Sequence, residues 1–207
     1  MTVGGSPRYV MTGNTTKAIV IGNSLVDGGS YGVSFAAAQV VITDTIIRNM
    51  RFTGLSVGQG DLQMVRGEIS NNGTGVEGAS VGNLFTNVTF NGRNGTGIVV
   101  YWFGEGNAKL VMRGCTVNAT IQLENRAVAD LGNSSSAGNN TLRADPGVAL
   151  DITGGDGPPV DAVGNTWRPV QEANSEGRYP PGKMVTGPEP AATRANYAIG
   201  GKRVLNL

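Results

Sequence analysis

The sequence of 207 residues contains no histidine and only one cysteine, Cys115. Without histidine the chain lacks the most common general base and metal ligand, so any catalysis would depend on carboxylates, arginine, lysine or tyrosine. One cysteine cannot form an internal disulfide, and the position of Cys115 in an apolar repeat predicts a buried structural thiol. With 16 basic and 15 acidic residues, the net charge favours no nucleic-acid partner.

Proline and long apolar runs are scarce as well. No proline occurs between Arg8 and Asp145, as expected where almost every backbone N–H is used in a sheet ladder. No apolar run approaches the roughly 18 residues of a membrane span, and the first residues lack the pattern of a signal peptide. From these residue types we predict no metal site, no cofactor and no assignable catalytic residue.

The main feature of the chain is a repeat of 21 to 27 residues. Seven short phrases, GNSL, TDTI, RGEI, NVTF, GCTV, NNTL and GNTW, each end on an apolar residue predicted to be buried: Leu25, Ile46, Ile69, Phe90, Val117, Leu142 and Trp167. A second strand in most repeats has its own predicted inward position: Val33, Leu55, Val76, Ile98, Ile121 and Val148. A period of this size with strand-type alternation indicates a solenoid, in which stacking of the units makes the core.

A third apolar segment, such as Leu62–Met64 or Leu110–Met112, completes each repeat. We therefore predict an all-β protein, a single-stranded parallel β-helix with three sheets and six to seven coils. Residues 18–167 form this solenoid, and residues 1–17 form a partial first coil or an N-terminal cap. Residues 168–207, rich in proline and glycine, form a non-repetitive tail predicted to pack along the helix.

Two phrases, at 69–76 and 90–98, resemble the parallel β-helix repeat of pectin-lyase-like proteins. The segments 138–142, 162–167 and 170–179 resemble a bacterial subgroup of right-handed β-helix proteins of unknown function. The resemblance implies a right-handed helix and a secreted or cell-surface location. It implies no particular activity, because the fold hosts lyases, hydrolases, epimerases and adhesins.

Residues directly before the anchors form a column predicted to face outward: Ser24, Thr45, Glu68, Thr89, Thr116, Thr141 and Thr166. Its hydroxyl groups would stack at about 4.8 Å. Such a ladder suits ice binding, as in some β-solenoids, or an ordinary exposed strand, since threonine favours strands. One position earlier, Asn23, Asn140 and Asn165 are predicted to stack their amides at a turn.

The longest repeat carries the only run of three aromatic residues, Tyr101, Trp102 and Phe103, followed by Glu105. We predict that these side chains bind a sugar, or else cover the edge of the core. The coil geometry brings Glu77 and Glu124 to the same side, one coil below and one coil above. Two acids could hydrolyse a glycosidic bond, although the spacing does not establish the required separation.

We interpret the chain as a non-catalytic structural or binding module for carbohydrate or another protein. The alternative is a carbohydrate-active enzyme, a lyase or glycoside hydrolase acting on acidic polysaccharide. That alternative predicts clustered basic and acidic residues on one sheet face, and the outward columns are mostly small and neutral. The first coil, near Val10 and Ile19–Ile21, is also predicted to associate end to end with another molecule through unpaired strand edges.

Overall fold

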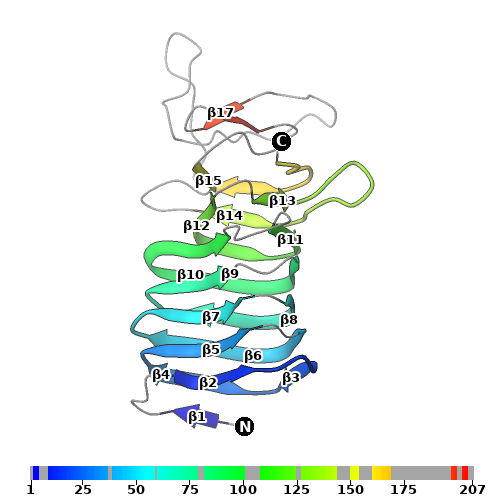
Figure 1. Ribbon diagram of the computed structural model, residues 1–207. Coiled ribbons are helices and arrows are strands. Elements are labelled where there is room, and N and C mark those ends of the chain that lie inside the picture. Colours follow the sequence, from blue (N-terminus) through cyan, green and yellow to red (C-terminus); the bar gives the residue numbers. More distant parts are fainter. Residues whose placement is uncertain are drawn as a thin grey trace.

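The computed structural model shows an all-β molecule that stacks short strands into a column (Figure 1). The residues that it describes contain no helix. These residues are 2–4, 9–36, 39–58, 60–78, 82–100, 108–124, 127–143, 150–153, 160–168, 197–199 and 202–204.

Three parallel sheets run along the column. The first consists of β1 (Thr2–Gly4), β4 (Leu25–Gly29), the later parts of β6 (Val40–Met50), β8 (Asp61–Ser70) and β10 (Gly82–Val100), the start of β12 (Thr116–Glu124), β14 (Thr141–Arg143) and β16 (Thr166–Arg168). The second consists of β2 (Tyr9–Asn14), β5 (Tyr31–Ala36), β7 (Thr53–Val57), β9 (Thr74–Gly78), the ends of β10 and β12, and β15 (Leu150–Thr153). The third consists of β3 (Ile19–Gly22), the starts of β6, β8 and β10, β11 (Lys109–Arg113) and β13 (Val128–Asp130).

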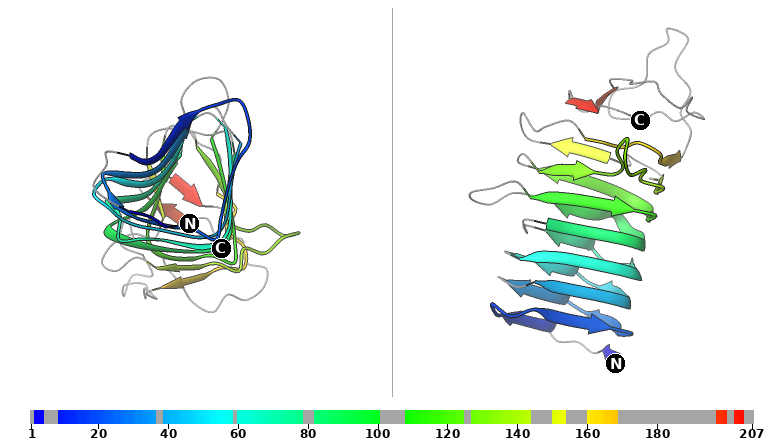
Figure 2. Two further views of the ribbon diagram at one scale, coloured as in Figure 1. Left: turned by 90° about the horizontal axis from the view of Figure 1, so that it is seen from below. Right: turned by 90° about the vertical axis from the view of Figure 1, so that its right-hand side faces the viewer.

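Seen along its axis, the column has a roughly triangular section (Figure 2). This arrangement confirms the predicted parallel solenoid. The structure has about five turns, slightly fewer than the six to seven coils predicted. A separate antiparallel pair joins β17 (Tyr197–Ile199) and β18 (Lys202–Val204). The packing of 168–207 along the helix stays a prediction.

One turn recurs before the strands of the first sheet from β4 to β16. Its central residue has a positive φ, between 48° and 73°, at seven positions along the chain: Asn23, Asp44, Arg66, Asn87, Gly114, Asn139 and Gly164. Asparagine, aspartate and glycine tolerate this left-handed conformation best. Three residues after the first six of these positions, the chain places a side chain on the inside of the first sheet. The side chain of the last predicted anchor, Trp167, lies outside those that the structure describes.

This turn corrects the predicted anchors in the two lowest coils. The buried residues of the first sheet are Val26, Ile47, Ile69, Phe90, Val117 and Leu142, each no more than 1% exposed. Leu25 and Ile46 face outward and are only half-buried. In both coils two branched apolar residues are adjacent, so alternation alone does not decide which one faces inward. A shift of one residue moves a strand's side chains to the other face.

The same shift affects two other predicted columns. Thr45 is fully buried, and its hydroxyl donates to the carbonyl oxygen of Thr43 at 2.8 Å. Ser24 likewise lies one position before the outward residue of its coil. Asn23 occupies the left-handed position instead of stacking with Asn140. The stack of Asn140 on Asn165 is confirmed, with Nδ2 of Asn140 donating to Oδ1 of Asn165 at 2.8 Å.

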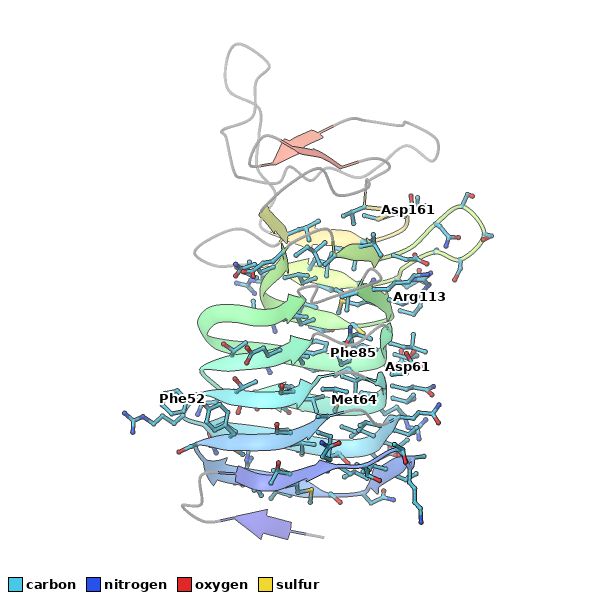
Figure 3. All side chains as sticks on the ribbon, in the orientation of Figure 1. Phe52, Asp61, Met64, Phe85, Arg113 and Asp161 are labelled. Carbon is cyan, nitrogen blue, oxygen red and sulfur yellow. The ribbon has the colours of Figure 1, made fainter. Side chains whose placement is uncertain are left out.

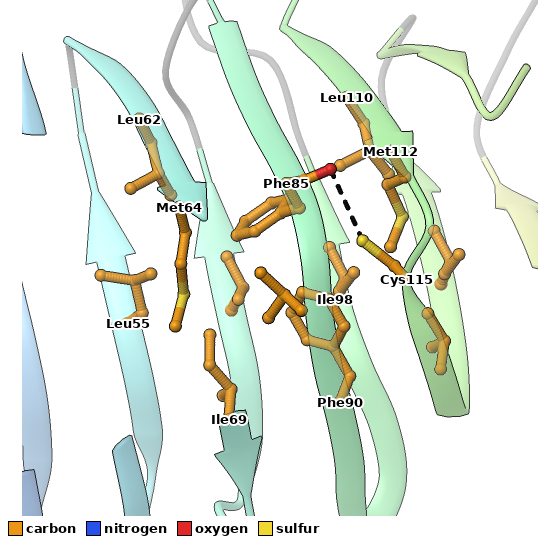
Figure 4. Packing of buried hydrophobic residues seen from close by; sticks show 14 of the residues in the cluster. Leu55, Leu62, Met64, Ile69, Phe85, Phe90, Ile98, Leu110, Met112 and Cys115 are labelled. Carbon is orange, nitrogen blue, oxygen red and sulfur yellow. Dashed lines mark hydrogen bonds between the residues drawn. The ribbon is translucent and has the colours of Figure 1, made fainter. Parts of the chain in front are cut away.

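The core is a continuous stack of apolar side chains from the three sheets (Figure 4). Phe85 and Phe90 meet edge to face with centroids 5.2 Å apart, a favoured aromatic geometry. The predicted inward residues of the second sheet are confirmed from Val33 to Ile121. In the next coil Leu150 pairs with Ile121, and the predicted inward residue Val148 lies outside the described residues.

Cys115 is buried as predicted, and its thiol donates to the carbonyl oxygen of Phe85 at 3.5 Å. Burial raises the pKa of this thiol above its usual value, because the interior disfavours the charged thiolate. A buried thiol with a raised pKa is a poor nucleophile, so Cys115 acts as a core residue.

Two buried asparagines satisfy backbone groups where the coil turns a corner. Oδ1 of Asn72 accepts from the Met50 amide at 2.9 Å, and Oδ1 of Asn140 accepts from the Cys115 amide at 2.8 Å. Buried polar groups need such partners, because an unpaired one destabilises the fold by about 1–3 kcal/mol. These amides therefore hold successive coils together.

The corrected register gives a direct test with a matched pair of adjacent isoleucines. Ile47→Ala should lower the free energy of unfolding by about 2–5 kcal/mol, since it opens a cavity in the core. Ile46→Ala should lower it by less than about 1.5 kcal/mol, because Ile46 faces outward. Denaturant unfolding measures both changes. A larger loss for Ile46→Ala would show that the predicted anchors were right and this register wrong.

Candidate functional site

The aromatic segment predicted to bind a ligand, Tyr101, Trp102 and Phe103 with Glu105, lies outside the described residues. Its role therefore stays a prediction. The two carboxylates assigned to the same side, Glu77 and Glu124, are described and half-buried.

Glu77 and Glu124 both belong to the second sheet. The register aligns Glu77 with Val99, and Val99 with Gln122. Glu124 therefore lies two coils above Glu77 and two residues further along the strand. Strand spacings of about 4.8 Å and 3.3 Å per residue give a Cα separation of roughly 12 Å.

The carboxylates of these two acids accept hydrogen bonds from different residues. Oε2 of Glu77 accepts from the Thr53 hydroxyl, in the coil below, at 3.0 Å. Oε1 of Glu124 accepts from Nε2 of Gln122 at 2.6 Å. The sheet brings both acids to one face as expected, but the carboxylate of Glu77 is held toward the coil below, away from Glu124. A hydrolytic pair instead needs two carboxylates that flank one bond.

The outward face of the first sheet presents a regular polar surface in its upper coils. Thr89, Thr116, Thr141 and Thr166 lie in register on four successive strands. At about 4.8 Å per strand, this ladder extends roughly 14 Å along the axis. Four of the six predicted hydroxyl residues thus form the ladder, and Glu68 continues the column below Thr89.

A second column, two residues further along each strand, was not recognised in the sequence. Asn91 pairs with Asn118, and Nδ2 of Asn118 donates to Oδ1 of Asn91 at 2.7 Å. Both positions alternate with the threonines in the phrases Thr89-Phe90-Asn91 and Thr116-Val117-Asn118. The spacing of two residues between each threonine and asparagine could have predicted this column, since residues i and i+2 of a strand share a face. We call these two columns the threonine–asparagine face.

Charged side chains on the outside pair between neighbouring coils. The ion pairs are Arg48–Asp27, Arg66–Asp44 and Arg113–Asp130, each at 2.8 Å. Asn49 and Arg48 hold the pKa of Asp27 below its usual range by hydrogen bonding, and Arg66 does the same for Asp44. Exposed pairs such as Arg48–Asp27 and Arg66–Asp44 contribute little to stability, whereas both side chains of Arg113–Asp130 are only 20% exposed. In the part of the chain that the structure describes, no three metal-ligating residues cluster.

The N-terminal end of the column contains an open cavity of about 690 Å³ between the first coils. Its lining is mostly apolar: Val10, Met11, Thr12, Ile19, Val20, Ile21, Gly22, Ser24 and Phe35. Val20 is 73% exposed. Among the described strands, β2 and β3 each pair on one side only. This end therefore presents both apolar side chains and free strand edges.

A family model described as the right-handed beta helix region matches residues 10–166. The chain belongs to this family, and the resemblance to right-handed parallel β-helix proteins is confirmed. No curated protein and no solved structure matches the chain significantly. None of the described segments is a helix that could cross a membrane.

The lowered pKa of Asp27 predicts a pH dependence of stability. A carboxyl group whose pKa is lower in the folded state stabilises the fold above its unfolded pKa, and this contribution disappears as the pH falls through the folded value. We expect Asp27→Asn to lower the melting temperature at pH 6, and the difference from the wild type to shrink below about pH 3, since the usual value is 3.8. Thermal unfolding at several pH values measures this.

Asp61→Asn provides the control, because Asp61 is exposed and forms no ion pair with a described residue. If Asp27→Asn and Asp61→Asn behaved alike at pH 6, the bonds from Asn49 and Arg48 would contribute nothing measurable.

Proposed function

We propose that the chain is a non-catalytic binding module of a secreted or cell-surface protein, and that it binds carbohydrate on the outside of its first sheet. The threonine–asparagine face is the observation that supports this most directly. It is regular, and it offers hydroxyl and amide groups that both donate and accept hydrogen bonds. Charged residues continue its columns at the ends, with Glu68 below Thr89 and Arg143 above Asn118.

A polysaccharide suits such a face because its own hydroxyl groups recur along the chain. Each new hydrogen bond contributes only about 0.5–1.5 kcal/mol net. Several coils acting together can still give useful affinity, because a ligand bound at one coil meets the next coil at high effective concentration. The rigid stack also limits the entropy lost on binding.

The alternative function, a lyase or hydrolase of acidic polysaccharide, depends on Glu77, Glu124 and the segment from Tyr101 to Glu105. An assay of the unsaturated-uronate absorbance band with mixed polyuronates tests the lyase, and release of reducing ends tests the hydrolase. Activity that Glu77→Gln or Glu124→Gln abolishes would replace the binding proposal with the enzymatic one.

The binding proposal predicts a loss of affinity when the threonine–asparagine face is blocked. In Thr116→Lys/Thr141→Lys, two long side chains cover the centre of the ladder and remove two hydroxyl groups. At about 0.5–1.5 kcal/mol per hydrogen bond, we expect roughly tenfold weaker binding of soluble β-glucan, xylan or galactomannan. Affinity electrophoresis in gels that contain each polysaccharide measures this change.

Thr86→Lys is the matched control, because Thr86 occupies an outward position of the third sheet in register with Arg113. It should migrate as the wild type does. Equal retardation of the wild type and the double variant would exclude this face as the binding surface. A wild type that binds no polysaccharide in the panel would contradict the carbohydrate function itself.

We also propose that the N-terminal coil associates with a second molecule, supported by the exposed Val20, the apolar cavity and the free edges of β2 and β3. Val20→Lys adds a charge there without removing a core residue. If the proposal holds, light scattering at high concentration should show a dimer for the wild type and a monomer for Val20→Lys. Val111→Lys, at an outward position in the same column of the third sheet, controls for added charge. A strictly monomeric wild type would contradict the association.

A further inference from the structure

Two aromatic rings lie at the corner where the first sheet turns into the second, in the lower coils. Tyr31 begins β5, and Phe52 directly precedes β7. Figure 3 shows Phe52 at the edge of the column opposite Asp61 and Arg113. Backbone bonds to both neighbouring coils fix this position: the Phe52 amide donates to Ser30 O at 2.9 Å, and Thr74 N donates to Phe52 O at 2.8 Å.

Phe52 is 45% exposed, and with Val20 it is one of two large hydrophobic residues exposed in the described part of the chain. Its neighbours in the stack explain this exposure. In the coil above, a Cβ added to Gly73 would lie 2.7 Å from Phe52 O and 3.2 Å from Phe52 Cα. No side chain therefore extends from position 73 over the ring, and Ser30 is the small residue below it.

The ring of Phe52 is nevertheless held in place. Its centroid lies 5.3 Å from that of Tyr31, with the planes inclined at 35°. The guanidinium carbon of Arg51 lies 5.1 Å from the Phe52 centroid. A cation near an aromatic face is attracted by the ring quadrupole. The pair thus forms a preorganised aromatic platform of which nearly half of Phe52 remains open to solvent.

A polar ladder runs up the same corner three residues before the platform. Nδ2 of Asn71 donates to Oδ1 of Asn49, and Nδ2 of Asn49 donates to Asp27 at 2.7 Å. All three hydrogen-bonding residues lie on successive coils, and both asparagines are exposed. Asn49 has a left-handed φ of 61° and the chain bends at 51 and 52, so the Cα atoms of Asn49 and Phe52 lie closer than the roughly 10 Å that three extended residues span. The ladder and Phe52 can therefore contact one ligand of the size of a disaccharide.

We propose that this corner, formed by Tyr31, Phe52, Asn49 and Asn71, is a subsite that stacks the ring of a hexopyranose. The C–H groups on one face of a pyranose are weakly positive and pack against the negative face of an aromatic ring. The hydroxyl groups at the rim of the sugar then bond to the amides of the ladder. This inference rests on the proposed carbohydrate-binding function and adds a second, separate contact region to it.

Asp27 is already paired with Arg48 at 2.8 Å. Arg51 lies against Phe52 and forms no ion pair with a described residue, so one positive charge remains beside the platform. Amides, which carry no net charge, supply the remaining hydrogen-bonding groups of the ladder. Binding of a neutral sugar there should change little between low and high salt, since screening weakens only charged contacts.

The size of the platform also favours a sugar over a protein partner. A stable protein interface buries about 800 Å² on each side, whereas one aromatic side chain contributes about 150–250 Å². Two rings and two amides form a patch much smaller than such an interface and comparable to one or two sugar units.

The test uses the full chain with soluble β-glucan, xylan and galactomannan as probes. Phe52→Ala should weaken binding at least tenfold, and Phe52→Trp, which keeps a larger aromatic face, should bind at least as tightly as the wild type. Leu84→Ala is the matched control, because Leu84 is a half-buried outward residue of the third sheet. Titration calorimetry measures affinity, and NMR of ¹³C-labelled phenylalanine rings shows whether the Phe52 signal moves.

The outcomes separate this subsite from the function on which it rests. Suppose that Phe52→Ala binds as the wild type does, that the Phe52 ring signal of the wild type does not move on adding the probe, and that Thr116→Lys/Thr141→Lys loses binding. The subsite is then overturned and the carbohydrate function stands. If the wild type binds none of the probes, both are overturned. Ring signals that respond only to protein concentration would identify a contact between two copies and overturn the sugar assignment.

Discussion

The left-handed turn that precedes the strands of the first sheet from β4 to β16 sets the register of the whole stack. It occurs at seven positions from Asn23 to Gly164, and at the first six it lies three positions before a buried side chain. The turn therefore decides which residues enter the core and which form the outward columns. In each coil the strand begins at the same distance from this turn, so equivalent side chains stack at about 4.8 Å. The ladders of threonine and asparagine result from this stacking.

Most of the fold could be predicted from the sequence because each coil of a solenoid shows the same period and the same alternation of apolar residues. The alternation in phrases such as Asn87-Val88-Thr89-Phe90 indicates both the strand and its inward residue. Prediction failed where two branched residues are adjacent, as in Leu25-Val26 and Ile46-Ile47, because both fit either face. Counting from the turn would have resolved both cases, because Asn23 and Asp44 align with Asn87.

The candidate sites were harder to predict because they depend on contacts between coils. The sequence singled out the run of three aromatics at Tyr101, whereas Phe52 is one isolated aromatic in a short turn. Its exposure depends on Gly73, which lies 21 residues later and one coil above. Likewise, the bond between Asn91 and Asn118 joins residues 27 positions apart. Such pairs become visible only when the length of each coil, and so its register with the next, is known.

The two contact regions differ in chemistry along the axis, and the register relates them. Phe52 belongs to the coil of Ile47, and the threonine–asparagine face begins two coils higher, at Thr89, about 10 Å along the axis. The strands of the first sheet end at the corner that carries Phe52, so both regions lie on connected surface. A polysaccharide that crosses the coils obliquely can therefore place one ring on the aromatic platform and its next units against the threonines. Since the core beneath is continuous, the two regions keep a fixed separation, and a ligand long enough to reach both gains the second contact without a further loss of translational freedom.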